Sequence, residues 1–163
     1  MSKESTILIK RFGAVWQLRA EIFIPKPVEL LWPFFSDPAN LEKITPPAMR
    51  FRILTPHNSP AYPGLMISYR VSPMPWYRTN WLTEITAVKD GKYFIDEQRK
   101  GPYAIWHHEH HFSPTPGGTI CTDIVTYRIP GGALGSILHS LFIRKKLMGI
   151  FRYREVVLRS HFQ

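Results

Sequence analysis

One turn signal constrains the fold of this chain more than any other: Asp90-Gly91, set between two segments of alternating residues. A two-residue type I′ turn needs positive φ at both positions, and Asp-Gly is among the sequences that favour it most strongly. The pattern therefore predicts a hairpin of two strands, at roughly 78–88 and 92–99. The pairing that follows sets Lys89 opposite Lys92, Ile85 opposite Asp96 and Thr83 opposite Gln98.

Two more turns extend the same antiparallel sheet. Lys100-Gly101-Pro102-Tyr103 leads into a predicted strand at roughly 104–113, and the segment 114–118 leads into one at 119–129. The register across 114–118 is the less firmly defined, because a slip of one residue turns every side chain to the other face. The pairs predicted across these turns are Gln98 with Trp106, Asp96 with His108, His108 with Asp123 and His110 with Cys121.

One face of these four strands is predicted to be aromatic and polar at once. A half-buried antiparallel sheet normally places apolar groups on its inner face, and polar groups are costly to bury unless they are paired. We therefore expect this face to line a ligand-binding cavity, with Glu84, Glu97, Arg99, His107 and Glu109 on the solvent side. The expected cavity residues are Trp81, Phe94, Asp96, Gln98, Trp106, His108, His110, Phe112, Asp123 and Tyr127.

His108 lies between two carboxylates in this register, so Asp96 and Asp123 are expected to orient it and raise its pKa. The sequence leaves open whether this network is structural or presents polar groups to a ligand. His108, Asp96 and Asp123 are also the candidates for catalysis. His108-x-His110 with a carboxylate could form a two-histidine, one-carboxylate metal site. The register sets His110 one row away from the acids, so no metal is expected.

Composition bounds the remaining possibilities. At 163 residues the chain is expected to form a single domain, with its core at about 15–158. Cys121 is the only cysteine, which excludes an internal disulfide and fits a reducing compartment. Residues 1–12 lack the long apolar core of a signal peptide or membrane span, so a cytoplasmic location is predicted. No cofactor is expected, since no GxGxxG motif is present, and no nucleic acid partner, since arginines and aromatics do not interleave.

The rest of the chain supplies strands at 15–24, 50–55 and 64–71 and two short helices, at 27–35 and from Asp37-Pro38 to about Ile44. A long helix is predicted from Ser136 to about Arg159. Its apolar residues do not form one clean stripe, so we expect it to be buried on more than one side. The segment 136–163 carries +5 of the formal net charge of +9. Besides packing on the sheet, this helix could contact loops, a second copy or a membrane surface.

Strand, two short helices, six strands and a long helix is the element order of the helix-grip fold. The chain resembles the START-like superfamily of ligand-binding domains (SRPBCC), which includes polyketide cyclase/dehydrase and coenzyme-Q-binding groups. The resemblance implies an α+β fold in which a curved antiparallel sheet of about seven strands wraps around a long C-terminal helix. The matching motifs include Phe23-x-Pro25, Leu31-Trp32-x-Phe34, Ser36-Asp37-Pro38-x-Asn40-Leu41, Trp81-x-Thr83-x-Ile85, Phe94-x-Asp96-x-Gln98-x-x-Gly101-Pro102-Tyr103-x-x-Trp106-x-His108-x-His110-x-Phe112 and Asp123-x-Val125-x-Tyr127.

Three functions are compatible with these features. The first is non-catalytic binding of a small hydrophobic or amphipathic molecule between the sheet and the C-terminal helix. The second is a cyclase/dehydratase-type enzyme with His108 as general acid or base. The third is an interaction or membrane-surface module that uses the basic C-terminal helix, which includes the possibility of a homo-oligomer. We rank them in that order.

Overall fold

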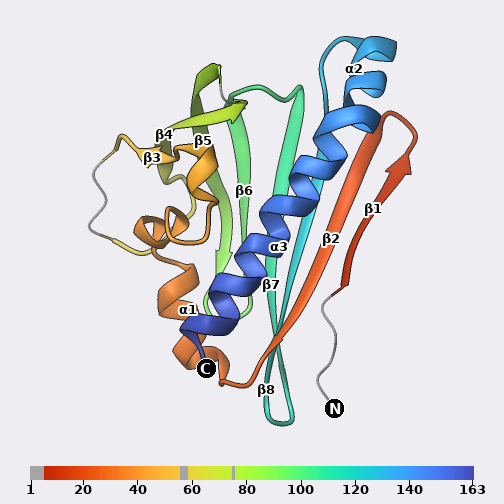
Figure 1. Cartoon of the computed structure of the whole chain (residues 1–163). Coiled ribbons are helices and arrows are strands. Elements are labelled where there is room, and N and C mark those ends of the chain that lie inside the picture. The colour runs from red at the N-terminus through yellow and green to blue at the C-terminus, as the bar shows by residue number, and fades with distance from the viewer. Residues whose placement is uncertain (1–5, 56–58, 75) are drawn as a thin grey trace.

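The computed structural model describes residues 6–55, 59–74 and 76–163. Eight antiparallel strands form one curved sheet in the order β1-β2-β8-β7-β6-β5-β4-β3 (Figure 1). The α+β helix-grip prediction is confirmed. The strands are β1 (Thr6–Phe12), β2 (Val15–Ile24), β3 (Arg52–Ile53), β4 (Met66–Met74), β5 (Tyr77–Lys89), β6 (Tyr93–Lys100), β7 (Ile105–Thr115) and β8 (Gly118–Arg128).

The helices lie on one face of this sheet (Figure 1). A continuous helical stretch at the C-terminal end crosses that face and consists of α2 (Gly132–Leu138), the π-helical turn η3 (His139–Ile143) and α3 (Arg144–His161). Between β2 and β3 come α1 (Val28–Phe35) and two 3₁₀ turns, η1 (Pro38–Leu41) and η2 (Pro47–Met49). Asp37 caps η1 as its sequence position predicts, since its side chain accepts a hydrogen bond from the Ala39 amide at 2.9 Å.

Strand β1 was not predicted. It pairs with β2 through a turn at Gly13, where φ is +55°. Ile7 and Ile9 are half-buried, but the apolar Leu8 between them is exposed. The sequence of β1 therefore lacks the apolar–polar alternation that identifies β2, in which every second residue from Trp16 to Ile24 is buried. An edge strand supported by backbone pairing on one side leaves little trace in a hydrophobic pattern.

The hairpin at Asp90 has the predicted partners near the cavity but a different turn. Lys89 pairs with Tyr93 and not with Lys92, so the loop has three residues, and φ is positive only at Gly91 among them. The predicted type I′ turn is therefore wrong. A bulge at Thr86 on β5 compensates for the extra loop residue. The two irregularities cancel, and Ile85 faces Asp96 and Thr83 faces Gln98 as expected.

The β6–β7 register is as predicted at its centre, where Asp96 pairs with His108. The β7–β8 register is wrong by two residues: His110 and not His108 pairs with Asp123. The reason is that both strands continue through the expected 114–118 loop, and only Pro116-Gly117 turns, with φ +85° at the glycine. A slip of two residues keeps the inward parity, so Asp123 remains on the inner face.

The buried residues of helix α3 form a single stripe, whereas the sequence predicted no clean stripe. Its buried residues are Leu147, Phe151, Arg154 and Leu158, which recur at spacings of four, three and four. One of the four is an arginine, and a scan for apolar side chains alone therefore breaks the stripe in the middle. Within the described part of the chain, no helix is long and apolar enough to cross a membrane.

Candidate functional site

A cavity of about 180 Å³ lies between the sheet, α3 and the α1–η2 region. Most of its wall is apolar and aromatic, with contributions from β4, β5, β6, β7 and α3. Polar side chains on the wall come from β5, β6, β7 and α3 and from the segment that follows α1. The volume is of the order of the apolar cavity of ~150 Å³ that takes up benzene. It therefore fits a ligand of one or two rings without rearrangement.

Six of the ten side chains expected at the cavity line it: Trp81, Phe94, Asp96, Trp106, His108 and His110. Phe112 instead packs under α1, 5.5 Å from Trp32 and 4.9 Å from Phe35 between ring centroids. Tyr127 forms a hydrogen bond of 2.8 Å with His139. It lies in a second core cluster, separate from the core around α1, whose buried members are Trp16, Leu18, Ala20, Val125, Tyr127, Leu147 and Phe151.

The two remaining expected residues support the cavity wall from behind. Gln98 clamps the β6–β7 loop, because its amide group donates to the Tyr103 carbonyl at 2.7 Å and accepts from the Tyr103 amide at 3.2 Å. This holds the Tyr103 ring 4.7 Å from Trp106 and 5.6 Å from Trp81. Asp123 lies behind the two histidines as seen from the cavity, and its carboxylate contacts a ring nitrogen of each.

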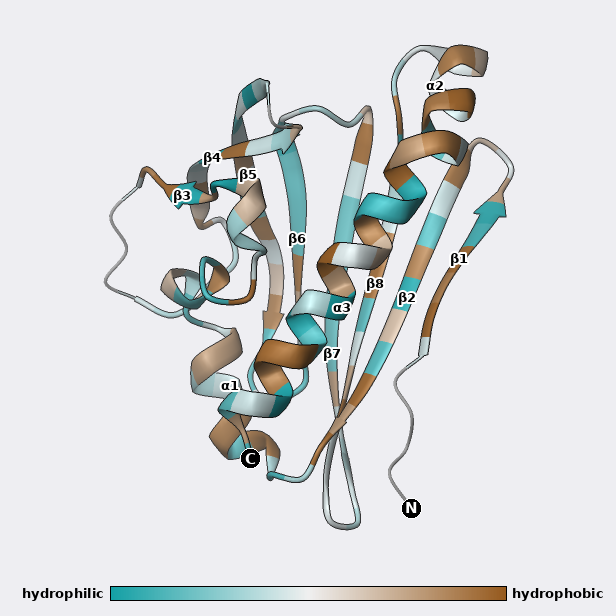
Figure 2. Ribbon diagram, in the orientation of Figure 1, coloured by the Kyte–Doolittle hydropathy of each residue, from teal (hydrophilic) through white to brown (hydrophobic). Residues whose placement is uncertain are grey.

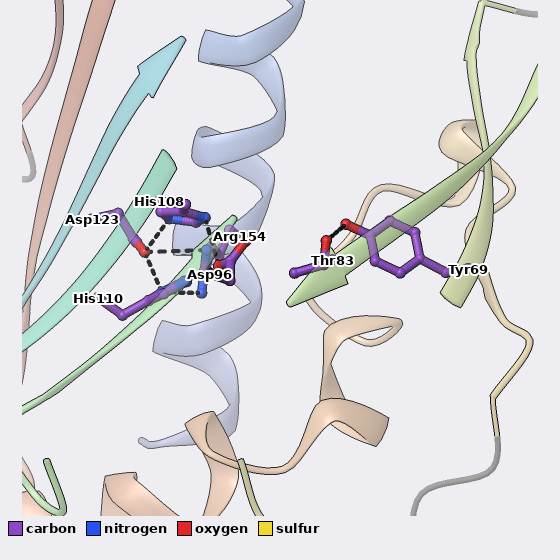
Figure 3. A network of polar contacts seen from close by, with 7 residues as sticks. All are labelled: Tyr69, Thr83, Asp96, His108, His110, Asp123 and Arg154. Carbon is purple, nitrogen blue, oxygen red and sulfur yellow. Dashed lines mark hydrogen bonds and ion pairs between the residues drawn. The ribbon is translucent and has the colours of Figure 1, made fainter. Parts of the chain in front are cut away.

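Asp96, His108 and His110 of the wall form a closed network with Asp123, which lies behind them (Figure 3). Asp123 Oδ1 lies 3.0 Å from His108 Nε2 and 2.8 Å from His110 Nδ1. Asp96 Oδ2 lies 3.0 Å from His110 Nε2 and 3.4 Å from His108 Nδ1. Every ring nitrogen of both histidines therefore faces a carboxylate oxygen. The expectation that His108 contacts an acid is confirmed, and the expectation that His110 lies away from the acids is wrong.

Arg154 completes the network and was missed by the sequence analysis. Its Nη1 lies 3.3 Å from Asp123 Oδ1, and its Nη2 lies 3.4 Å from His110 Nδ1. The residue is only 7% exposed, and it was not among the site residues expected from the sequence. The signal that could have found it is the helical spacing from Leu147 to Leu158, which puts Arg154 on the buried side.

The pKa values of both aspartates in the network are lowered. Burial would raise the pKa of Asp123, but Arg154 and the two histidines outweigh it and hold that pKa well below its ordinary value. The pKa of Asp96 is lowered by His108, His110 and Arg154 against the same opposing effect of burial. Both acids are therefore ionised at neutral pH.

The pKa values of the two histidines are shifted in opposite directions. Burial and the neighbouring His110 lower the pKa of His108. Burial acts in the same direction on His110, but hydrogen bonds to Asp123 and Asp96 outweigh it and raise the pKa. The opposite directions make His110 the more basic and His108 the less basic of the two imidazoles. The expectation that the pKa of His108 is raised is wrong, because the proton favours the better-bonded His110.

Asp96 is the member of the network most open to the cavity. Its side chain is 14% exposed, against 6% for His110. Its contacts to both histidines use Oδ2, and among the described residues no hydrogen bond reaches Oδ1. On the far side of the cavity, Tyr69 and Thr83 share a hydroxyl–hydroxyl hydrogen bond of 2.9 Å (Figure 3). The cavity therefore presents a charged acceptor on one wall and hydroxyl groups on the other.

Three of these residues also have the spacing of metal ligands. Asp96, His108 and His110 each offer one atom within 4.8 Å of the others, so the structure supplies the third ligand that the predicted register lacked. In the present geometry, however, Asp96 Oδ2 occupies the point on which the two ring nitrogens converge. The positive Arg154 also lies next to the group. The residues are arranged as a hydrogen-bonded network, and the expected absence of a metal stays a prediction.

Comparisons with known proteins agree with this architecture. Residues 24–147 match the family described as "Polyketide cyclase / dehydrase and lipid transport". Protein Ms6760 from Mycobacterium smegmatis is similar in structure, with a TM-score of 0.67 at 18% identity over 97% of this chain and 99% of that chain. A protein from Arthrobacter aurescens has a TM-score of 0.68 at 14% identity, with 97% and 92% of the two chains covered.

A third similar structure is the di-domain ARO/CYC StfQ from the steffimycin biosynthetic pathway. Its TM-score is 0.62 at 12% identity, over 91% of this chain and 52% of StfQ. None of the curated proteins compared with the chain matches it in sequence. At these identities the structural matches show the fold alone.

Proposed function

The chain belongs to the polyketide cyclase / dehydrase and lipid transport family, and from that premise we propose that it binds a small, mostly apolar molecule in the cavity. Family and fold indicate a ligand-binding or cyclase role. The observation that carries the binding proposal is the composition of the cavity wall, in which aromatic side chains surround a few polar groups and Asp96 is the most exposed member of the buried polar network. Apolar burial then supplies most of the affinity, at about 25 cal/mol per Å², and the polar groups fix the orientation.

The free Oδ1 atom of Asp96 narrows the chemistry of the ligand. An ionised carboxylate only accepts hydrogen bonds, so the favoured ligand carries a hydroxyl or N–H group on an apolar ring system. A ligand with a carboxylate of its own is disfavoured there, because two negative charges would meet in a buried site.

A matched pair of ligands tests this proposal. Binding is followed by the quenching of tryptophan fluorescence, to which Trp81 and Trp106 in the cavity wall contribute. 2-Naphthol should bind with higher affinity than 2-methoxynaphthalene, which has no hydroxyl proton. A hydrogen bond to a charged group is worth about 1.5–3 kcal/mol, so the preference should be about tenfold or more. Asp96→Asn should reduce the preference, while Glu84→Gln on the outer face should leave it unchanged. Val71→Phe, which fills the cavity, should weaken both ligands. If neither compound binds the wild-type protein, the proposal is wrong.

A second candidate is an enzyme of the cyclase/dehydratase type, which the contact between Asp96 and His108 favours. Both ring nitrogens of His108 face carboxylates, so His108 as a direct acid or base is less well supported than the sequence suggested. Asp96 would meet the substrate, and His108 would exchange the proton with Asp96 Oδ2. An activity that survives Asp96→Asn but not Asp123→Asn would argue against this arrangement.

Three further expectations stay predictions: a cytoplasmic location, the absence of nucleic acid binding, and the possibility of a homo-oligomer. Cell fractionation, a gel-shift assay and light scattering of the purified protein address them in turn.

A further inference from the structure

An exposed apolar surface lies at the start of the C-terminal helical stretch, outside the cavity. We define the α2 apolar surface as Leu134, Ile137, Leu141 and Phe142, whose exposed fractions are 73%, 56%, 63% and 57%. Residues at these spacings share one side of a helix. Figure 2 shows this end of the helix as a mainly hydrophobic segment that points away from the sheet.

The opposite side of the same segment is firmly packed. His139 is buried, stacks on the Trp16 ring at 4.2 Å and bonds the Tyr127 hydroxyl at 2.8 Å. Gly135 is buried against the Pro130 carbonyl, with no room for a side chain. The segment is therefore held with one defined side inward. The four apolar side chains face out because the fold places them there, and a patch of this kind marks an interaction surface.

The border of the α2 apolar surface is positively charged. Arg144, Lys145 and Lys146 follow it directly, and the sequence from 129 to 154 contains no acidic residue. Arg144 and Lys145 are exposed.

We propose that the α2 apolar surface and its basic border dock on an anionic lipid bilayer, with α2 and η3 lying in the membrane interface. A helix with exposed Leu, Ile and Phe beside Arg and Lys has the composition of interfacial helices. Each basic residue near an anionic leaflet adds about fivefold to binding. A second copy of the chain fits less well, because a two-fold interface on this surface would bring two sets of positive charges together.

The location of this surface connects it to the cavity. Leu147 lines the cavity and follows Phe142 by five residues, which is about 8 Å along a helix. Docking therefore brings the cavity close to the lipid bilayer, in which apolar molecules accumulate. The membrane proposal does not rest on ligand binding, and the binding of 2-naphthol and the binding of vesicles are measured separately.

Co-sedimentation with vesicles tests the proposal. The protein should pellet with vesicles of phosphatidylcholine and phosphatidylglycerol, more weakly with phosphatidylcholine alone, and less as salt is raised. The triple variant Leu134→Ser, Ile137→Ser, Leu141→Ser should bind at least about tenfold more weakly. The matched control is Val156→Ser, since Val156 is an apolar residue of α3, 66% exposed and outside the surface. Lys145→Glu should weaken binding more than Arg152→Glu on the same helix.

A second measurement keeps the test independent of how the triple variant folds. An environment-sensitive label on Leu141→Cys, with Cys121 buried, should shift its emission to the blue when anionic vesicles are added. Absence of both sedimentation and shift for the single-substituted protein would overturn the proposal. It would equally be overturned by a dimer in light scattering that the triple variant abolishes, which would assign the surface to a second copy. Equal binding by the triple variant and Val156→Ser would also reject it.

Discussion

Arg154 of α3 and Asp123 of β8 form an ion pair of 3.3 Å whose side chains are 8% and 10% exposed. Removing two charges from water is costly, and such a pair is favourable only when further hydrogen bonds satisfy the remaining atoms. Both histidines add contacts to Asp123 Oδ1, at 3.0 Å and 2.8 Å, so this oxygen is satisfied, whereas Arg154 Nε is buried without a hydrogen-bond partner among the described residues. The pair fixes the position of α3 on the sheet at the turn that also closes the cavity.

Asp123→Ala is expected to destabilise the fold more than Asp96→Ala. Asp123 is in contact with three donors, among them Arg154, and its loss leaves a buried guanidinium unpaired, which costs about 3–5 kcal/mol. Asp96 contacts only the two histidines and is partly open to the cavity, so its loss should cost about 1–3 kcal/mol. Denaturant titration measures both, with Glu109→Ala on the outer face as the control. Costs below half a kcal/mol for both variants would mean that the network does not form.

The stability of the protein should be greatest near the pKa of an unperturbed histidine, about 6.5. His108 has a lowered pKa, so below pH 6.5 the unfolded chain takes up a proton that the folded chain refuses, and stability falls as pH falls. His110 has a raised pKa, so above pH 6.5 the folded chain keeps a proton that the unfolded chain releases, and stability falls as pH rises. A free energy of unfolding measured across this range should show a maximum.

Two variants separate the limbs of that profile. His108→Gln should flatten the acid limb and His110→Gln the alkaline limb. For each variant, the free energy of unfolding at every pH is compared with that of the same variant at pH 6.5. A second loss on the acid side is expected below about pH 4, because Asp96 and Asp123 have lowered pKa values and their contribution disappears as they are protonated. The charge assignment would be contradicted if His110→Gln removed the acid limb instead.

The fold was predictable because its strongest signals are local. Alternation identifies β2, β5, β6, β7 and β8, and the two-residue period keeps each residue on its face even where the register slips by two. For this reason Asp123 was expected on the correct face, although its predicted partner was His108 and the actual one is His110. The lengths of the turns were not predictable. Asp90-Gly91 and Pro116-Gly117 are each compatible with loops of more than one length, and the sequence does not show which length is adopted.

The site was predictable only in the parts that come from the hairpins. Asp96, His108 and His110 follow from strand parity, whereas Arg154 comes from a helix some thirty residues further on, and its contact with Asp123 is a tertiary relation. An arginine in an otherwise apolar stripe is normally assigned to the surface. Only its position between Phe151 and Leu158, on the same side of the helix, indicates burial.

Removing the hydroxyl of Tyr127 should loosen the start of the C-terminal helix. This hydroxyl bonds His139 at 2.8 Å inside the second core cluster. Tyr127→Phe keeps the ring but leaves a buried imidazole nitrogen without its partner, at a cost of about 1–3 kcal/mol. Amide exchange should then accelerate in α2 and η3 and remain unchanged in β4 and β5. Uniform acceleration across the protein would show that the bond does not act locally.

The purified protein is expected to contain no tightly bound metal, even though Asp96, His108 and His110 have ligand spacing. A metal at the point where the histidine nitrogens converge would require Asp96 Oδ2 to withdraw and His110 Nε2 to be free of a proton, and the positive charge of the metal would be added beside Arg154. Elemental analysis after chelation measures the content directly. Added zinc should leave the unfolding temperature of the wild type unchanged, whereas Arg154→Met, which removes the neighbouring charge, is the variant in which zinc binding should first become detectable. Stoichiometric metal in the wild type after chelation would refute this prediction and favour the enzyme candidate.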